Sequence, residues 1–221
     1  MTTAAPPSEA TSDELALALE AQEIAAALRE GRPVSDARFD ALYPKSHRRR
    51  SSVHWTPMEV ALRASAMLAA SPGGRILDVG SGSGKMCLIG ALVSGAHWTG
   101  VEQDSAMVRV AARVARSLSI AERTSFVHAD GLGLDWSPFG GIYLYNPFSE
   151  AALKTRPVDP SPRQAAFIHA VVAVEHKLAT LQVGARVVTL HGFGGDLPPE
   201  FELEESVPMH KDELALWVRT H

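Results

Sequence analysis

The sequence predicts an α/β fold built around a doubly wound, mostly parallel sheet of seven strands, with a helical extension in front of it. Three observations lead to this prediction. Short β-rich runs alternate with helical patterns from residue 75 onward, the first run ends in a glycine-rich turn, and the chain ahead of that run reads as helical. Strands that alternate with helices indicate a parallel sheet with helices on both faces.

Composition limits the kind of protein this is. The chain has 221 residues, of which 46% are hydrophobic, and this length favours one domain with an appendage. The formal net charge of -4 gives no sign of nucleic-acid binding. The single cysteine, Cys87, forms no intrachain disulfide and no cysteine-based zinc cage, which fits a reducing compartment. Without an apolar leader or a run of ~18 apolar residues, we expect a cytoplasmic protein with no membrane contact.

Residues 1–55 are predicted to be a disordered tail followed by a helical extension. Thr11 and Glu14 have the spacing of a capping box ahead of an apolar run, and Gly31 supplies the stop of that helix. Residues 35–44 indicate a short second helix, which Pro44 ends. The basic run that follows, from Lys45 to Arg50, is interpreted as part of a polar connector, with a grip on phosphates or on an acidic surface as the alternative.

Residues 56–221 are predicted to form the sheet domain. Thr56, Pro57 and Glu59 supply an N-cap, a first-turn proline and a capping-box acid for a helix that runs to about residue 70. The seven β-rich runs are 75–79, 97–102, 124–129, 141–148, 185–191, 201–208 and 213–221. Helical patterns occupy about residues 83–93, 104–118 and 161–181. The last two strands should pair antiparallel, because no helix-length segment separates them.

The glycine-rich turn "ILDVGSGSGK", residues 76–85, follows the first strand. In a doubly wound sheet, ligands bind beyond the carboxyl ends of the strands near the point where the strand order reverses, so a nucleotide-like cofactor is expected here. A phosphate-binding loop would need glycine in place of Val79 and a hydroxyl residue in place of Met86. A dinucleotide fingerprint would need its third glycine at Lys85. The first alternative fails, and the second is weakened.

The turn resembles the D-x-G-x-G-x-G motif of class I S-adenosylmethionine-dependent methyltransferases. Asp78, Gly80, Gly82 and Gly84 match it at every fixed position. The resemblance covers about residues 56–221 and implies the seven-stranded Rossmann-like fold of that class, transferase activity, S-adenosyl-L-methionine as cofactor and S-adenosyl-L-homocysteine as product. It also implies that these four residues, with Ser81, bind the cofactor, because glycines let a ligand lie against bare main chain.

Two acids beyond the turn extend this resemblance. Glu102 ends the second strand about 20 residues after the glycines, where a carboxylate accepts from both ribose hydroxyls. Gln103 follows it and joins the expected cofactor set. After the third strand, Asp130 is expected to accept from the adenine amino group, while Gly131 or Leu132 offers an amide to the ring. An Asp-Gly pair is also an ordinary turn.

The fourth strand ends in "YLYNPFSE", which resembles the Asn-Pro-Pro-aromatic motif of amino-group methyltransferases. Asn146, Pro147 and Phe148 match, although the second proline is missing. The resemblance implies that Asn146 and its neighbours, Tyr145 included, form the catalytic site for a nitrogen acceptor on a protein side chain or a small molecule. Asn146 would lie beside the cofactor as well. The alternative is a strand ended by Asn-Pro, with Phe148 in the core.

Other residues are candidates with weaker patterns. Tyr145, His128, His54 and His191 are possible acid, base or orienting groups. Trp55 or Thr56 would cover the methionine end of the cofactor, unless Trp55 packs as a hydrophobic staple and Thr56 serves as a cap. The glycine-rich residues 190–199 are expected to form a substrate-side loop without a helix.

Two other functions remain open from the sequence. The fold does not fix the activity, so a non-catalytic cofactor-binding or assembly protein is one alternative. A nicotinamide-dependent oxidoreductase is the second, because the glycine turn partly matches the dinucleotide fingerprint. The sequence indicates neither a metal site nor an oligomeric state.

Overall fold

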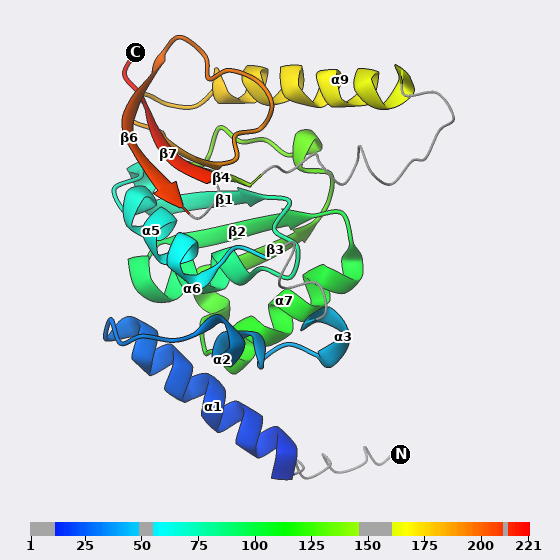
Figure 1. Ribbon diagram of the computed structural model, residues 1–221, viewed down its shortest axis with the longest axis vertical. Coiled ribbons are helices and arrows are strands. Elements are labelled where there is room, and N and C mark those ends of the chain that lie inside the picture. The colour runs from blue at the N-terminus through cyan, green and yellow to red at the C-terminus, as the bar shows by residue number, and fades with distance from the viewer. Residues whose placement is uncertain (1–11, 49–54, 146–160, 210–211) are drawn as a thin grey trace, which may run out of the picture.

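The computed structural model describes residues 12–48, 55–145, 161–209 and 212–221. Its centre is one seven-stranded sheet with the order β3-β2-β1-β4-β5-β7-β6 (Figure 1). The strands are β1 (Arg75–Val79), β2 (His97–Glu102), β3 (Thr124–His128), β4 (Gly141–Tyr145), β5 (Arg186–Leu190), β6 (Phe201–Met209) and β7 (Asp212–Arg219). Each of the seven predicted runs therefore forms a strand.

The pairing of the strands sets the edge at which ligands bind. β1 pairs in parallel with β2 on one side and with β4 on the other, and β3 and β5 continue the parallel sheet. β7 pairs antiparallel with both β5 and β6, as predicted for the last two strands. The strand order reverses between β1 and β4. In sheets of this kind, ligands bind beyond the carboxyl ends of the strands at that point.

Helices cover both faces of the sheet. One face carries α5 (Met58–Leu68), α6 (Lys85–Ser94) and α7 (Ser105–Ser117), and the other carries α9 (Ser161–Leu178) (Figure 1). The two faces have separate cores because side chains alternate along a strand. Ile76 and Trp98 belong to the core on the α6 side, whereas Leu77 and Ile142 belong to the core on the α9 side. Short 3-10 turns, η1 (Pro72–Gly74), η2 (Ala121–Arg123) and η3 (Gly131–Gly133), precede β1 and flank β3.

The N-terminal extension packs as a second layer on the α6 and α7 side. It contains α1 (Ser12–Arg29), α2 (Asp36–Asp40) and α3 (Lys45–Arg48), and α1 contacts both α6 and α7. Gly31 has a φ of 68° and lets the amide of Arg32 donate to the carbonyl of Ala27, which closes α1 as predicted.

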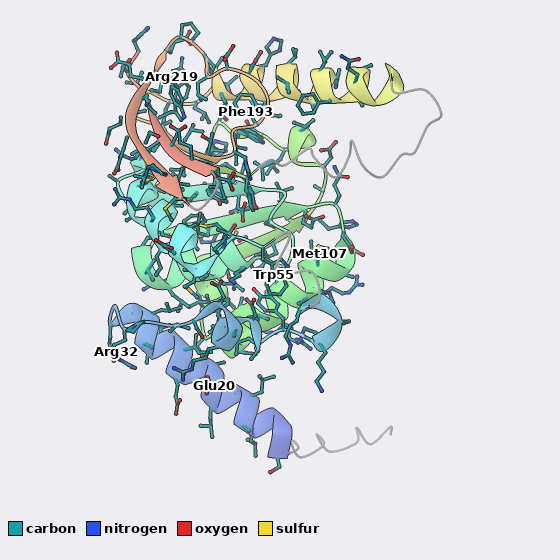
Figure 2. The ribbon with its side chains drawn as sticks, viewed as in Figure 1. Glu20, Arg32, Trp55, Met107, Phe193 and Arg219 are labelled. Atoms are coloured by element: carbon teal, nitrogen blue, oxygen red, sulfur yellow. The ribbon has the colours of Figure 1, made fainter. Side chains whose placement is uncertain are left out.

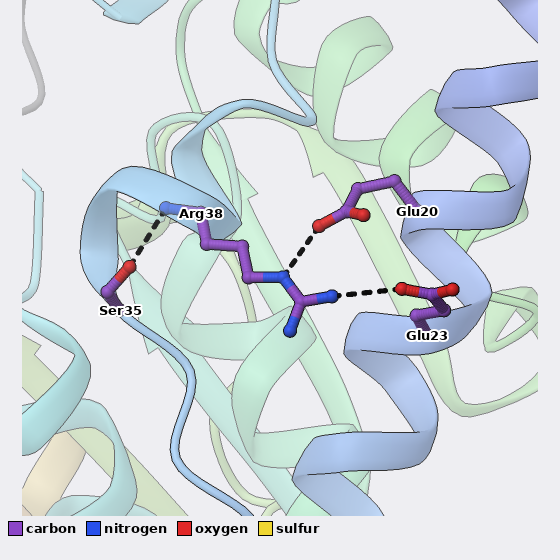
Figure 3. Close-up of polar contacts among 4 residues, drawn as sticks. All are labelled: Glu20, Glu23, Ser35 and Arg38. Carbon is purple, nitrogen blue, oxygen red and sulfur yellow. Dashed lines mark hydrogen bonds and ion pairs between the residues drawn. The ribbon is translucent and has the colours of Figure 1, made fainter.

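A side chain of α2 fixes that helix to α1. Arg38 donates to Glu20 at 2.6 Å and to Glu23 at 3.2 Å (Figure 3). The hydroxyl of Ser35 accepts from the amide of Arg38 at 3.2 Å and caps α2. One arginine therefore links two carboxylates on neighbouring turns of α1 to the start of the extension's second helix.

Two local predictions were wrong. The residues from Lys45 to Arg48 form the helical turn α3 instead of a connector, and the rest of the basic run lies outside the described residues. Thr56 does not cap α5, because its hydroxyl lies 3.3 Å from the phenol oxygen of Tyr143. The amide of Met58 donates instead to Asp36 of the extension at 2.9 Å. The carboxylate of a distant residue thus accepts from the free backbone amide that a local capping side chain would otherwise bind.

Lys85, the residue that begins α6, anchors the extension to the sheet domain. Its side chain is only 4% exposed, and Nζ lies 2.5 Å from Asp36 Oδ1 and 2.7 Å from Asp40 Oδ1. The ammonium also lies 6.0 Å from the centre of the Phe39 ring and 5.7 Å from that of the Trp55 ring. A buried cation with two carboxylates and two aromatic rings holds α2 beside the glycine-rich turn.

Within the part of the chain that the structure describes, no helix is both long and apolar enough to cross a membrane.

We predict that Lys85→Met lowers the free energy of unfolding by about 3–5 kcal/mol, because it leaves the buried carboxylate of Asp40 without its partner. Chemical denaturation measures this loss. The control is Arg32→Ala, which removes an exposed ion pair with Glu30 and should cost less than about 1 kcal/mol. Equal, small losses for the two variants would contradict the anchoring role of Lys85.

Candidate functional site

The glycine-rich turn follows β1 at the carboxyl edge of the sheet. Gly80, Gly82 and Gly84 have φ values of 77°, 54° and 79°, a region that residues with a side chain rarely adopt. A Cβ on Gly84 would lie 2.5 Å from a ring carbon of Phe126, so this glycine is required for packing inside the protein. Among the described residues, a Cβ on Gly82 would approach only the sulfur of Met107, at 3.9 Å. The second glycine therefore leaves main chain accessible from the outer side of the turn.

Glu102 lies at the end of β2, directly beside this turn. Its Oε2 accepts from the amide of Gly82 at 3.0 Å, and its Oε1 accepts from the amide of Asp104 at 2.8 Å. The side chain is half-buried, and a carboxylate can accept up to about four hydrogen bonds. The two backbone donors thus orient a carboxylate that keeps acceptor capacity for a ligand.

The ends of β2 and β3 are joined by side chains. Asp130 Oδ1 accepts from the amide of Leu132 at 3.0 Å and from Gln103 Nε2 at 3.3 Å. His128 Nε2 lies 3.1 Å from the carbonyl oxygen of Gln103. The amide of Leu132, one of two donors expected for an adenine ring, is therefore directed to Asp130. Glu102, Gln103 and Asp130 thus lie together at the ends of β2 and β3, beside the glycine turn.

Asp78 lies beneath the turn and is nearly inaccessible to solvent. Its Oδ2 accepts from the thiol of Cys87 at 3.4 Å. The pKa of Asp78 is raised to about 7, chiefly by burial; the Cys87 hydrogen bond opposes this rise, and the nearby charge of Glu102 adds to it. This carboxyl group therefore takes up a proton far more readily than an exposed aspartate.

A pocket of about 210 Å³ lies between the turn and the extension. It is lined by Ser46, His47, Trp55, Ser83, Asp104 and Met107. Trp55 and Met107 come from its two sides, the extension side and α7 (Figure 2). The hydroxyl of Ser81 lies against β2, where a Cβ on Gly100 would be 2.5 Å from its oxygen, and the hydroxyl of Ser83 lies beside the phenol of Tyr43.

Trp55 belongs to this pocket and also packs against the extension. Its ring centre lies 4.5 Å from that of Tyr43, with the planes tilted by 57°. Thr56, by contrast, is buried against β4. Of the two residues expected to cover the cofactor, the structure brings Trp55 to the pocket and places the hydroxyl of Thr56 against Tyr143.

A second group of side chains lies at the same edge of the sheet, at the ends of β4 and β5. The rings of Tyr145 and His191 stack with centres 5.9 Å apart and planes 11° apart. Asp212, at the start of β7, places Oδ1 2.8 Å from His191 Nδ1. Burial raises the pKa of Tyr145, and the charge of Asp212 adds to this rise.

Asp212 is the member of this group that the sequence reasoning missed. The antiparallel pairing of β5 with β7 sets Leu190 opposite Leu214, which brings the start of β7 to His191. This register is set by the pairing of distant strands and left no pattern in the sequence. Asn146, Pro147, Phe148 and His54, all predicted for the site, lie outside the described residues.

Residues 191–200, between β5 and β6, contain no helix, as predicted for the glycine-rich loop. Phe193 of this segment is buried in the core on the α9 side (Figure 2). A Cβ on Gly194 would lie 2.3 Å from the ring of Phe167 of α9. The amide of Asp196 donates to Glu175 of α9 at 3.3 Å, so the loop is held against that helix.

Sequence comparisons match the glycine turn and its surroundings. A family model described as protein-L-isoaspartate(D-aspartate) O-methyltransferase matches residues 50–150. The uncharacterized Escherichia coli protein YjhP is 42% identical over 67 residues, which are 30% of this chain and 27% of YjhP. The release factor glutamine methyltransferase of Rhodospirillum rubrum is 35% identical over 97 residues, 42% of this chain and 29% of that enzyme. The chain thus spans less than a third of the length of these curated relatives.

Three solved structures have the same arrangement of elements. An RNA methyltransferase from Salinibacter ruber in complex with S-adenosyl-L-homocysteine has a TM-score of 0.55 and 22% identity, and the match covers 75% of this chain and 94% of that one. TrmN from Thermus thermophilus has a TM-score of 0.57 and 19% identity over 78% and 52% of the two chains. A SAM-dependent O-methyltransferase from Thermotoga maritima has a TM-score of 0.51 and 16% identity over 80% and 72%. These likenesses confirm the predicted fold class.

We predict that the free energy of unfolding of the Asp78→Asn variant rises relative to that of the unmodified protein as the pH increases from 5 to 8. Chemical denaturation without ligand measures this difference. The folded state holds the Asp78 proton up to a pKa of about 7, whereas the unfolded state releases it near 3.8. The unmodified protein therefore loses stability as pH rises through this interval, and the asparagine variant does not.

The control for this measurement is Asp135→Asn. Hydrogen bonds from Ser137 lower the pKa of Asp135, so this group is ionised in both states throughout the pH range. The difference between this variant and the unmodified protein should stay constant from pH 5 to 8. The same constant difference for Asp78→Asn would contradict the protonation of Asp78 by burial.

Proposed function

We propose that this chain, which has the class I S-adenosylmethionine-dependent methyltransferase fold, binds S-adenosylmethionine beyond β1, β2 and β3 and transfers its methyl group to a nitrogen acceptor. The observation that carries the proposal is the carboxylate of Glu102, held by the amides of Gly82 and Asp104 beside an accessible glycine turn. A carboxylate in this position suits the two neighbouring hydroxyls of a ribose.

The residues at this edge of the sheet match the successive parts of S-adenosylmethionine. Glu102 would accept from the ribose hydroxyls, and Asp130 with Gln103 would lie at the adenine. The glycine turn would lie at the methionine end. S-adenosylmethionine carries a methyl group that its sulfonium already activates, and it is consumed at each turnover as a substrate. The protein therefore has to align the acceptor with the methyl carbon and exclude competing water.

The nitrogen acceptor is supported by the sequence that follows β4. Asn146, with Pro147 and Phe148, begins directly after Tyr145, at the reversal of the strand order. The release factor glutamine methyltransferase and the matched protein-L-isoaspartate(D-aspartate) O-methyltransferase family are protein methyltransferases by name, which supports a protein side chain as acceptor, whereas the family's name specifies an oxygen acceptor. A small amine is the other class that this site would accept.

We further propose that residues 56–221 are the catalytic domain and that the extension completes the pocket. This proposal is supported by the pocket beside the turn, which is lined by Ser46 and His47 of α3 and by Trp55. The ion pairs of Lys85 with Asp36 and Asp40 hold α2 at this position.

We predict that Glu102→Ala weakens binding of S-adenosylmethionine and S-adenosylhomocysteine at least about tenfold, a difference of ~1.4 kcal/mol, because it removes the acceptor of the ribose hydroxyls. Isothermal calorimetry on both proteins measures the change. The control is Glu122→Ala, in the exposed η2 turn that precedes β3. This variant should bind S-adenosylmethionine and S-adenosylhomocysteine with the same affinity as the unmodified protein. Binding of NAD, with no binding of either sulfur compound, would contradict the proposed function.

We predict that Asn146→Ala abolishes methyl transfer while affinity for S-adenosylmethionine stays within about tenfold, because the residue would face the acceptor. The assay follows radiolabelled methyl groups into cell extract that is then separated into protein, RNA and small molecules. Calorimetry on the same variant supplies the affinity. Loss of binding together with transfer would move Asn146 to the cofactor pocket, and unchanged transfer would leave it a strand-ending residue. Absence of label from every fraction with the unmodified protein would indicate a non-catalytic binding protein.

A further inference from the structure

Three side chains from three different strands meet where β4 and β5 end. His191 follows β5, Tyr145 ends β4 and Asp212 begins β7. His191 Nδ1 lies 2.8 Å from Asp212 Oδ1, and the Tyr145 ring stacks on the imidazole with a centre-to-centre distance of 5.9 Å. Since β4 lies next to β1 in the sheet, this group lies at the same edge of the sheet as the glycine turn.

The backbone at His191 is in an unusual conformation for a residue with a side chain. Its φ is 63°, in the left-handed region that glycine adopts most easily. Gly192 and Gly194, which follow it, also have positive φ values. Holding an imidazole in such a conformation costs stability, and strained residues of this kind concentrate at functional sites.

The contact with Asp212 determines which ring nitrogen remains available. A carboxylate 2.8 Å from Nδ1 favours the tautomer with the proton on Nδ1, so Nε2 carries the lone pair. The imidazole side chain is 43% exposed, so Nε2 can be reached from the solvent side of the sheet edge. Asp212 is only 21% exposed, and its carboxylate stabilises an imidazolium when Nε2 takes up a proton.

We propose that Nε2 of His191, oriented by Asp212 and Tyr145, accepts the proton that the acceptor loses when it is methylated. The proposal rests on the proposed function. In the balanced step, the lone pair of the acceptor nitrogen forms the bond to the methyl carbon and the electrons of the carbon–sulfur bond pass to sulfur. The proton of the acceptor passes to Nε2. The acceptor class is thus an amine that must lose a proton; a carboxylate, already ionised at neutral pH, needs no such group.

The titratable groups that face the imidazole, among the described residues, come from two strands. Asp212 of β7 supplies a negative charge, and Tyr145 of β4 supplies a neutral phenol, since burial raises its pKa.

The test uses the full chain with His191→Gly. The backbone at this position suits glycine, so the variant should fold with a denaturation midpoint no lower than that of the unmodified protein. We expect the initial rate of radiolabelled methyl transfer, into the extract fraction that the unmodified protein labels, to fall at least about 100-fold. Added imidazole should restore the rate at least about tenfold, and affinity for S-adenosylmethionine by calorimetry should stay within about threefold.

Three further readouts separate proton transfer from a structural role. Nitrogen NMR of the His191 ring should find the proton on Nδ1 and the lone pair on Nε2. Asp212→Asn should lower the rate, but less than His191→Gly does. His97→Gln, at the opposite edge of the sheet, should keep the normal rate, with no response to imidazole.

The outcomes distinguish this inference from the function on which it depends. A folded His191→Gly protein that transfers methyl groups at the normal rate, or that imidazole does not rescue, overturns the inference alone. So does a His191 ring with its proton on Nε2. An unmodified protein that binds no S-adenosylmethionine and labels no fraction overturns the proposed function, and this inference with it.

Discussion

The parallel pairing of β1 with β2 on one side and β4 on the other is the constraint on which the rest of the site depends. It brings the ends of five parallel strands to one edge and reverses the strand order between β1 and β4. The glycine turn, the Glu102 carboxylate and the Tyr145 ring follow or end three different strands, and this pairing sets them along one edge of the sheet.

The turn itself is held from both sides. Glu102 accepts from the amide of Gly82 in front of the turn, whereas Asp78 and Cys87 lie buried beneath it. Lys85, the residue that follows the last glycine, reaches the carboxylates of Asp36 and Asp40 in the extension. The start of α6 therefore couples the shape of the turn to the position of α2, and the extension becomes part of the pocket wall.

The parts of the fold that depend on local patterns could be predicted from the sequence. The strands follow from short β-rich runs, and the glycine turn and Glu102 follow from fixed spacing along the chain. Contacts between distant residues left no such pattern. Thr56 reads as a helix cap because its neighbours fit one, but Asp36 supplies the partner of the Met58 amide. His191 was a candidate without a partner until the pairing of β5 with β7 placed Asp212 beside it.

The measurement that tests the central claim most directly is a crystal structure of the chain with S-adenosylhomocysteine. The account predicts that both ribose hydroxyls lie within hydrogen-bonding distance of the Glu102 carboxylate, with the amino-acid end of the ligand at the glycine turn. A ligand bound elsewhere on the protein, or in the reverse orientation with its adenine at the turn, would contradict it.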